Sequence, residues 1–481
     1  LRCWHADHTS WGKKQEQQEG EITTTNFAPS DQEYNAPPLS LLEREKGKPA
    51  VGDIKANANI IKRTLHNFGI TVEMDEISIG PTVTRYALKP AEGVRLQKIL
   101  ALQNNLELAL AASPVRIEAP IPGKSLVGIE VPNLKKATVS LASLLSEKVF
   151  TDDQRPLLGA LGRDITGNAH FTNIAKMPHI LIAGATGSGK SVSIHALITS
   201  LLYRNGPATM RFIMVDPKRV ELTLYNPVPH LLTPVITEPK KAILALKWAA
   251  KEMDRRYDLL QAHSVRDIAS YHENVVAAWN KDEETAAPDQ MPYIVIVIDE
   301  LADIMQSYPR ELEAAIVRLA QMSRAVGIHL VLSTQRPSVN VITGLIKANI
   351  PARIALQVAS QIDSRTILDA AGAEKLLGAG DMLYLSGDMA KPHRIQTAFI
   401  SEQEVKKVVD YIKKNNEANL DEITLSGNAH ESPNAIFSAS LEDDDADDDL
   451  YGEAKQIVEE AGKASTSFLQ RKLRVGYARA A

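Results

Sequence analysis

The residues with the clearest capacity for chemistry lie between His179 and Ser191, in the stretch HILIAGATGSGKS. This stretch satisfies the pattern G-x-x-x-x-G-K-[ST], with an apolar run before it and a helix-permissive run after it. Backbone amides of such a loop point at a β-phosphate, Lys190 neutralises the β- and γ-phosphates, and the Ser191 hydroxyl binds Mg²⁺. The candidate nucleotide-binding residues are Gly184, Ala185, Thr186, Gly187, Ser188, Gly189, Lys190 and Ser191.

Two acidic residues could supply the second Mg²⁺ ligand and the general base that the phosphate loop lacks. Asp299 and Glu300 directly follow the apolar run 293–298, which predicts a buried strand. At a strand end beside the phosphate loop, Asp299 can hold Mg²⁺ through water, and Glu300 can accept a proton from an attacking water. The alternative is that both acids only cap the following helix. Thr334 and Gln335 follow the next apolar run, where they either sense a γ-phosphate or cap a helix.

A group of basic residues after Gln335 could contact nucleic acid. Arg336 precedes a proline in a loop, Lys347 lies in a short glycine-bounded stretch, and Arg353 and Arg365 follow. Loop cations of this kind hold phosphate backbones without reading the base sequence. From spacing alone, solvated surface charges are the more common explanation.

The composition limits the classes of protein to which this chain can belong. With 481 residues, 44% of them apolar, two or three folded units with real cores are expected. The single cysteine, Cys3, excludes a disulfide framework and fits a reducing compartment. The net charge of −5 depends on the acidic run EDDDADDD over 442–449, so any basic surface must be local. No apolar run is long enough to predict a membrane-spanning helix.

The residue pattern divides the chain into five segments. Residues 1–53 are polar and interrupted by proline and glycine, which predicts a disordered linker. Residues 54–150 predict a small α/β domain. Over 151–414, apolar strands alternate with helices, which predicts a parallel sheet covered on both faces, with ligands at the carboxyl ends of its strands. Residues 415–449 form an acidic linker, and 450–481 begin a helix-turn-helix that the chain does not complete.

Several long motifs resemble the FtsK/SpoIIIE family of bacterial DNA translocases. The resemblance extends from about residue 50 to about 414 and again over 450–481. The motifs are GPTVTRYALKPAEGV (Gly80 to Val94), APIPGKSLVGIEVPN (Ala119 to Asn133), MPHILIAGATGSGKSV (Met177 to Val192), PHLLTPVIT (Pro229 to Thr237), VIDELADIM (Val297 to Met305), TQRPSVNVITGLIKANIPARIA (Thr334 to Ala355) and IDSRTILDAAGAEKLLGAGDMLYL (Ile362 to Leu385).

The resemblance implies a fold and an assembly. Residues 54–150 would form the family's α domain, and 151–414 a RecA-like β motor domain with a P-loop NTPase site. The domains would stack as two tiers of a hexameric ring around double-stranded DNA, which ATP hydrolysis draws through the pore. Arg324, in QMSRAVGIH, matches an arginine that reaches the γ-phosphate of the neighbouring subunit. A surface cation near a helix end is the simpler alternative.

The resemblance also assigns DNA contacts. Arg336, Lys347 and Arg365 match basic residues of two pore loops, while Gln361 stands where relatives often carry lysine. The segment Asp216-Pro217-Lys218 matches a family motif and is assigned to the nucleotide side of the sheet.

The last residues resemble the opening of the family's γ winged-helix domain, which reads short DNA sequences. Arg474 and Arg479 are its candidate DNA contacts, and Ala478 stands where relatives often carry asparagine. A complete γ domain often stimulates a partner recombinase. The chain as given is expected to be cytoplasmic, and a longer protein would be anchored at the membrane through an N-terminal region.

The sequence is therefore interpreted as an ATP-driven translocase of double-stranded DNA, acting in chromosome segregation during cell division or sporulation. One alternative is a related ring ATPase that pumps conjugative DNA or secreted proteins, and the loop cations argue against it. The other is a non-catalytic DNA-binding module with a nucleotide switch. The presence of both Lys190 and Glu300 argues against this second alternative, since a switch could dispense with the base.

Overall fold

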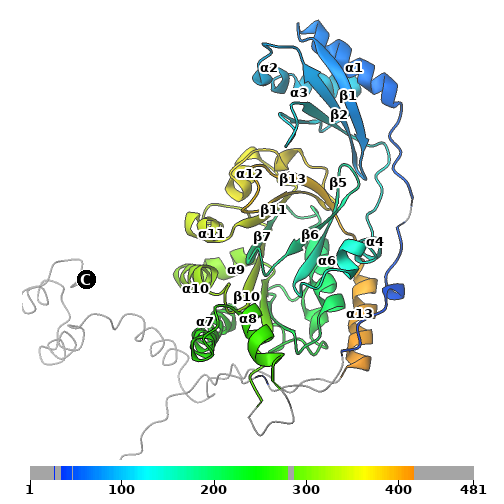
Figure 1. Cartoon of the computed structure of the whole chain (residues 1–481). Helices are drawn as coiled ribbons and strands as arrows, with labels where there is room; N and C mark the ends of the chain where they lie inside the picture. Colours follow the sequence, from blue (N-terminus) through cyan, green and yellow to red (C-terminus); the bar gives the residue numbers. More distant parts are fainter. Residues whose placement is uncertain (1–26, 28–33, 46, 280–286, 417–481) are drawn as a thin grey trace, which may run out of the picture. The chain divides into compact units, whose positions relative to one another are not determined.

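Two β-sheets organise this protein. The computed structural model describes residues 27, 34–45, 47–279 and 287–416, all within one compact unit that spans Thr23–Thr424. A four-stranded sheet has the order β1-β2-β4-β3, and a nine-stranded sheet has the order β6-β5-β13-β12-β11-β7-β10-β9-β8 (Figure 1). Among the described residues, none of the helices combines the length and the apolar character needed to cross a bilayer.

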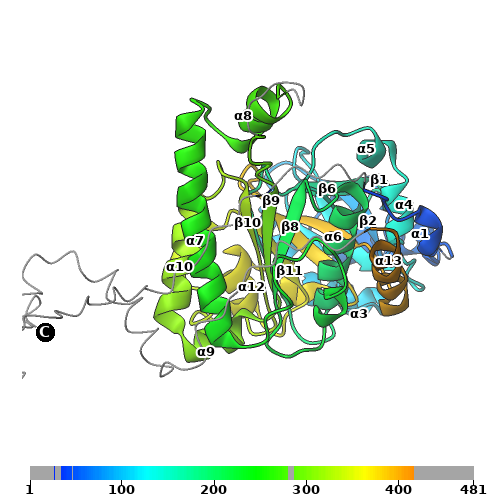
Figure 2. The ribbon, with the colours of Figure 1, turned by 90° about the horizontal axis from the view of Figure 1, so that it is seen from below.

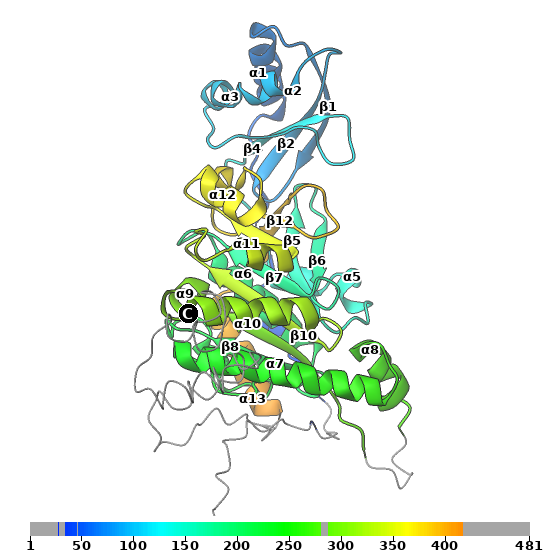
Figure 3. The ribbon, with the colours of Figure 1, turned by 90° about the vertical axis from the view of Figure 1, so that its left-hand side faces the viewer.

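The four-stranded sheet is antiparallel and is packed against three helices (Figure 3). Its strands are β1 (Val72–Ile79), β2 (Val83–Pro90), β3 (Arg116–Glu118) and β4 (Val127–Pro132), and its helices are α1 (Ile54–Asn67), α2 (Leu96–Leu100) and α3 (Gln103–Leu110). Asp53 begins α1 because its side chain accepts a hydrogen bond from the Ala56 amide. Ile61 and Leu65 of α1 are fully buried in a core with Tyr86 of β2.

The nine-stranded sheet is half parallel and half antiparallel. Its strands are β5 (Leu158–Asp164), β6 (Ala169–Asn173), β7 (His179–Ala183), β8 (Met210–Val215), β9 (Tyr293–Ile298), β10 (Ile328–Thr334), β11 (Ala352–Leu356), β12 (Asp381–Leu385) and β13 (His393–Thr397). The strands β11, β7, β10, β9 and β8 are parallel. The expectation of a purely parallel sheet was wrong, because β12, β13, β5 and β6 extend it with antiparallel pairs.

Helices cover both faces of the nine-stranded sheet, as the alternating pattern predicted (Figure 2). One face carries α6 (Lys190–Arg204) and α13 (Glu402–Asn415), and the other carries α7 (Pro239–Ala262), α9 (Leu301–Ser307) and α10 (Pro309–Met322). The shorter helices are α4 (Leu141–Leu145), α5 (Lys148–Thr151), α8 (Ile268–Tyr271), α11 (Gly344–Asn349) and α12 (Gln361–Leu368). Since both faces are covered, every residue of β7, β8, β9 and β10 is buried.

Part of the segment 1–53, which was expected to be a disordered linker, is packed against the motor. Phe27 is only 3% exposed, and the guanidinium carbon of Arg211 lies 6.0 Å from its ring centroid. The Tyr34 hydroxyl donates to the Leu202 carbonyl oxygen at 2.7 Å. These aromatic residues lie among polar residues without a period, so no pattern indicated their burial. Residues 417–481, which include the γ-like tail with Arg474 and Arg479, lie outside the described residues.

Candidate nucleotide-binding site

The phosphate loop connects β7 to α6 at the carboxyl edge of the parallel strands. Gly189 has φ of +103°, a left-handed conformation that favours glycine. A Cβ atom there would lie 2.4 Å from the Gly380 amide nitrogen, so the position admits no side chain. The Gly380 amide donates to the Ser188 carbonyl oxygen at 2.7 Å. The turn before β12 therefore supports the phosphate loop from behind.

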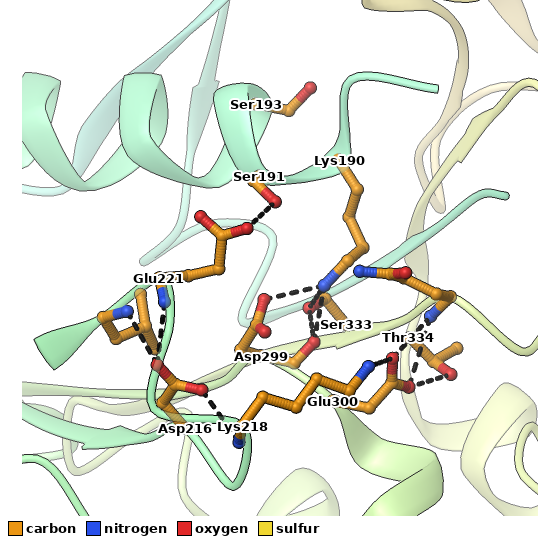
Figure 4. A network of polar contacts seen from close by, with 12 residues as sticks. Lys190, Ser191, Ser193, Asp216, Lys218, Glu221, Asp299, Glu300, Ser333 and Thr334 are labelled. Atoms are coloured by element: carbon orange, nitrogen blue, oxygen red, sulfur yellow. Dashed lines mark hydrogen bonds and ion pairs between the residues drawn. The ribbon is translucent and has the colours of Figure 1, made fainter. Parts of the chain in front are cut away.

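Lys190 and Asp299 form a buried ion pair beneath this loop (Figure 4). The Lys190 Nζ donates to the Asp299 carbonyl oxygen and to Oδ1, each at 2.7 Å, and to the Ser333 Oγ at 3.1 Å. Both residues are at most 3% exposed. Burial raises the pKa of the Asp299 carboxyl, and the charge of Lys190 opposes this shift. The Asp299 Oδ2 has no hydrogen-bond partner among the described atoms.

Glu300 is fully buried in a set of hydrogen bonds that it accepts. Its Oε1 accepts from the Thr334 hydroxyl at 2.6 Å, its Oε2 accepts from the Lys218 Nζ at 3.0 Å, and both oxygens lie within 3.2 Å of the Gln335 amide. Burial raises the pKa of Glu300, but these hydrogen bonds and the Lys218 charge outweigh it and hold the pKa below its usual value. Glu300 is therefore an oriented carboxylate at neutral pH.

For Glu300 and Gln335, the alternative to a catalytic role was that they cap a helix. Glu300 is the N-cap residue of α9, with its side chain 3.4 Å from the Ala302 amide nitrogen. Gln335 is in contact with the phosphate loop, because its Oε1 accepts from the Thr186 hydroxyl at 3.0 Å. The position predicted to sense the γ-phosphate thus lies beside the phosphate loop.

Sequence reasoning did not single out Glu221, although the structure brings it to the phosphate loop. The Ser191 hydroxyl donates to the Glu221 Oε1 at 2.7 Å. Hydrogen bonds from His195 and Ser191 lower the pKa of Glu221 to about 2, against the opposing effect of burial. The signal that could have found it was the Asp216-Pro217-Lys218 motif at the end of an apolar strand.

A cavity of about 500 Å³ opens beside the phosphate loop. The loop and the start of α6 form one side, while the other sides come from the segment 136–139, from Ala379, and from Gln396, Thr397 and Phe399 at the end of β13. The volume falls in the usual range of roughly 300–1,000 Å³ for small-ligand sites. The sequence analysis assigned none of these outer-wall residues to the nucleotide site, because they come from separate stretches of the chain.

The arginine expected to act on a neighbouring subunit lies away from this cavity. Arg324 follows the C-terminal end of α10, is exposed, and does not line the cavity in the described part of the chain. Its placement gives it no contact with the phosphate loop of its own subunit. The predicted action of Arg324 on a second copy of the chain stays a prediction.

The loop cations expected to contact DNA differ in their surroundings. Arg336 and Arg365 are exposed. Lys347 on α11 donates from Nζ to the Asp369 Oδ1 at 2.6 Å, and Arg353 on β11 donates to the Asp369 Oδ2 at the same distance. The Lys347 charge is thus shared with an acid, whereas those of Arg336 and Arg365 face solvent.

Comparison with known families accounts for most of the chain. Family models match residues 36–133 (FtsK alpha domain), 140–339 (FtsK/SpoIIIE family) and 445–481 (Ftsk gamma domain). Among known proteins, DNA translocase FtsK of Caldanaerobacter subterraneus subsp. tengcongensis is 51% identical over 451 residues, which cover 93% of this chain and 61% of that protein. The chain belongs to the FtsK/SpoIIIE family. The resemblance inferred from the motifs is thereby confirmed.

A second relative of this chain is named SpoIIIE rather than FtsK. DNA translocase SpoIIIE of Bacillus subtilis is 47% identical over 454 residues, which cover 94% of this chain and 56% of that protein. The chain therefore spans less than two thirds of the length of these relatives.

Solved structures show the fold of this FtsK/SpoIIIE chain. The pCW3 conjugation coupling protein TcpA, in its monomer form with ATPgS, has a TM-score of 0.50 and 24% identity, and covers 74% of this chain and 99% of its own. The cytoplasmic domain of the Thermomonospora curvata Type VII secretion ATPase EccC has a TM-score of 0.52 and 23% identity, and covers 61% of this chain and 36% of its own. The expected α/β fold class, with a RecA-like P-loop NTPase motor, is confirmed.

Proposed function

We propose that this chain is the motor of an ATP-driven translocase of double-stranded DNA, assembled as a hexameric ring that moves chromosomal DNA during division or sporulation. The observation that carries the proposal is the meeting of the phosphate loop, Lys190, Asp299 and Glu300 at one sheet edge beside a cavity of suitable size. The relatives named DNA translocases support DNA as the substrate.

The residues at the phosphate loop suit Mg²⁺ as well as ATP. The Ser191 hydroxyl and the Asp299 carboxylate, whose Oδ2 is buried without a hydrogen-bond partner among the described atoms, are the oxygen donors that Mg²⁺ prefers. When bound, Mg²⁺ neutralises charge on the phosphates. Lys190 adds a positive charge at the same phosphates, and the fixed carboxylate of Glu300 orients the attacking water and accepts its proton. Gln335 senses the γ-phosphate from its place against Thr186.

Hydrolysis in this proposal depends on assembly. Arg324 is exposed and remote from its own cavity, so it stabilises transition-state charge in the site of the next subunit. Light scattering with linear duplex DNA and a slowly hydrolysed ATP analogue tests this part, because hexamers should form on the duplex. A chain that stays monomeric under these conditions would contradict it.

DNA contacts in the proposal come from the exposed loop cations. Arg336 and Arg365 bind backbone phosphates, and Lys347 joins them when a phosphate replaces Asp369 as its partner. The γ-like tail adds Arg474 and Arg479, and a complete γ domain would engage a recombinase. This chain would work in the cytoplasm, as the motor part of a longer protein anchored at the membrane.

Steady-state ATP hydrolysis with and without long linear duplex DNA tests the central proposal. We expect strong stimulation by duplex, lost in both Lys190→Ala and Arg324→Ala. Arg318→Ala is the matched control for Arg324, because Arg318 is a half-exposed arginine of α10, the helix that Arg324 follows, and Asp254 is its partner. If duplex DNA does not change the rate of hydrolysis, the chain is still an ATPase, but the proposal that it translocates DNA is overturned. A motor for another substrate would then be the better interpretation.

A further inference from the structure

The loop after β8 carries a carboxylate into the phosphate-binding site. Glu221 lies just before the short 3₁₀ helix η2 (Thr223–Tyr225), and Figure 4 shows its side chain pointing at Ser191 on the first turn of α6. The Ser191 hydroxyl donates to its Oε1 at 2.7 Å. The catalytic roles assigned to Lys190, Asp299 and Glu300 leave this contact without a purpose.

The shape of the loop does not depend on the Glu221 side chain. Asp216, which is fully buried, accepts from the amides of Lys218 and Arg219 through Oδ1 at 3.1 and 2.9 Å. Its Oδ2 accepts from the amides of Glu221 and Leu222 at 2.9 and 3.0 Å. Because Asp216 already fixes the backbone on both sides, the carboxylate of Glu221 is not required to hold the loop in place.

The Glu221 carboxylate is nevertheless held in one orientation. Its Oε2 lies 3.3 Å from the His195 Nε2, and the His195 Nδ1 lies 2.9 Å from the Tyr225 hydroxyl. His195 is one turn after Ser191 on α6, so both residues meet Glu221 from the same helix face. One oxygen of Glu221 is thereby committed to His195, and the other is directed at Ser191.

We propose that Glu221 is a positioning residue of the Mg²⁺ site and acts through Ser191. A serine hydroxyl has one proton and two lone pairs. With the proton committed to Glu221, both lone pairs of the Ser191 oxygen are available to a divalent cation. The inference deepens the proposed function and rests on it, because it requires that Mg²⁺ and a nucleotide bind at the phosphate loop. Hydrogen-bond partners of metal ligands typically change metal affinity or activity by roughly 10–100-fold.

Calorimetric titration of the full chain with ATPγS, in Mg²⁺ and in EDTA, measures binding without turnover. Glu221→Ala should leave the affinity in EDTA within about twofold of wild type and raise the Mg²⁺ concentration needed for half-maximal tightening roughly tenfold. Glu221→Gln should recover most of the loss, because its amide oxygen can accept from Ser191 while its NH₂ group can donate to the His195 Nε2 in the tautomer that carries the ring proton on Nδ1. Glu402→Ala, which changes an exposed glutamate of α13, is the matched control.

A double-mutant cycle separates positioning from direct ligation. If Glu221 acts through Ser191, Glu221→Ala should change the Mg²⁺ requirement by less than about twofold when Ser191 is already alanine. Additive losses, or a loss in EDTA as large as that in Mg²⁺, would overturn the inference. If Mg²⁺ tightens ATPγS binding equally in wild type and in Glu221→Ala, the inference about Glu221 fails while the proposed function stands. Wild type that fails to bind ATPγS would overturn the proposed function as well.

Discussion

A buried ionic cluster joins the two sheets of the protein, and Arg394 lies at its centre. Arg394 on β13 donates to both oxygens of Asp381, at 2.9 and 2.6 Å, and to the Glu130 Oε2 on β4 at 2.7 Å. All three side chains are at most 3% exposed. Burial raises the pKa of Glu130, but Arg116 and Arg394 hold it below its usual value. Glu130 therefore remains charged in the interior because the two arginines neutralise it.

We predict that Arg394→Met destabilises the protein by about 4 kcal/mol, within the 3–5 kcal/mol that follow from removing one partner of a buried pair. Glu130 retains Arg116, whose Nη1 lies 3.0 Å from both of its oxygens. Asp381 retains the Leu377 amide at 2.8 Å but loses its bidentate partner. Most of the cost therefore falls on Asp381, which is left as a buried charge without a cation.

Urea unfolding followed by circular dichroism measures this cost. With an m value of about 3–4 kcal/mol/M for a chain of this size, a loss of about 4 kcal/mol lowers the midpoint by roughly 1 M. Arg155→Met is the control, because Arg155 pairs closely with Asp153 but its side chain is 52% exposed. An exposed pair contributes at most about 1 kcal/mol. Equal shifts in the two variants would refute the reasoning, since burial would then not set the cost.

Three further predictions concern the site and its surroundings. Gly380→Ala should lower the thermal midpoint and weaken ATPγS binding, because φ there is +88° and a Cβ atom would lie 2.2 Å from the Thr397 Cγ2; unchanged binding would contradict this. Glu300→Gln should retain ATPγS binding while hydrolysis falls at least 100-fold, as expected for a general base; near-normal hydrolysis would assign the proton to another group. Burial lowers the pKa of His179 to about 4 and of His329 to about 3, so each is neutral when folded and takes a proton on unfolding. Stability should therefore be complete above about pH 6.5 and fall by about 1.4 kcal/mol per pH unit for each histidine as the pH drops to 5; a flat profile in urea titrations would exclude it.

The fold and the site could be predicted from the sequence where one local pattern was sufficient. The phosphate loop combines glycines, a lysine and a continuous apolar strand, and the run before Asp299 is equally continuous, so both strand ends were identified. Their meeting followed from the parallel strand rule, and the Lys190 and Asp299 side chains are indeed in contact. The alternation of apolar strands with helices over 151–414 is also a local pattern, and it predicted the two helix layers.

The missed features depend on contacts between distant residues. β13 has the sequence HRIQT, in which polar residues conceal a strand that links β12 to β5 within the antiparallel half of the sheet. Phe27 is buried by Arg211 and its neighbours rather than by any local period. Glu221 is separated from Ser191 by 30 positions, and only the turn fixed by Asp216 brings the two together. No local pattern records contacts of this kind.

The position of the phosphate-loop strand in the sheet affects how the protein is made. β7 pairs with β10 and β11, and the Leu330 amide, which bonds to the His179 ring, follows it by 151 positions. At about 5–20 residues per second, synthesis of that interval takes roughly 8–30 s, during which the apolar strand has neither neighbour. Such distant pairing slows folding and exposes the nascent chain to aggregation, which is the condition that chaperones relieve. Nucleotide affinity is thus acquired late in translation, long after the motif that carries it has left the ribosome.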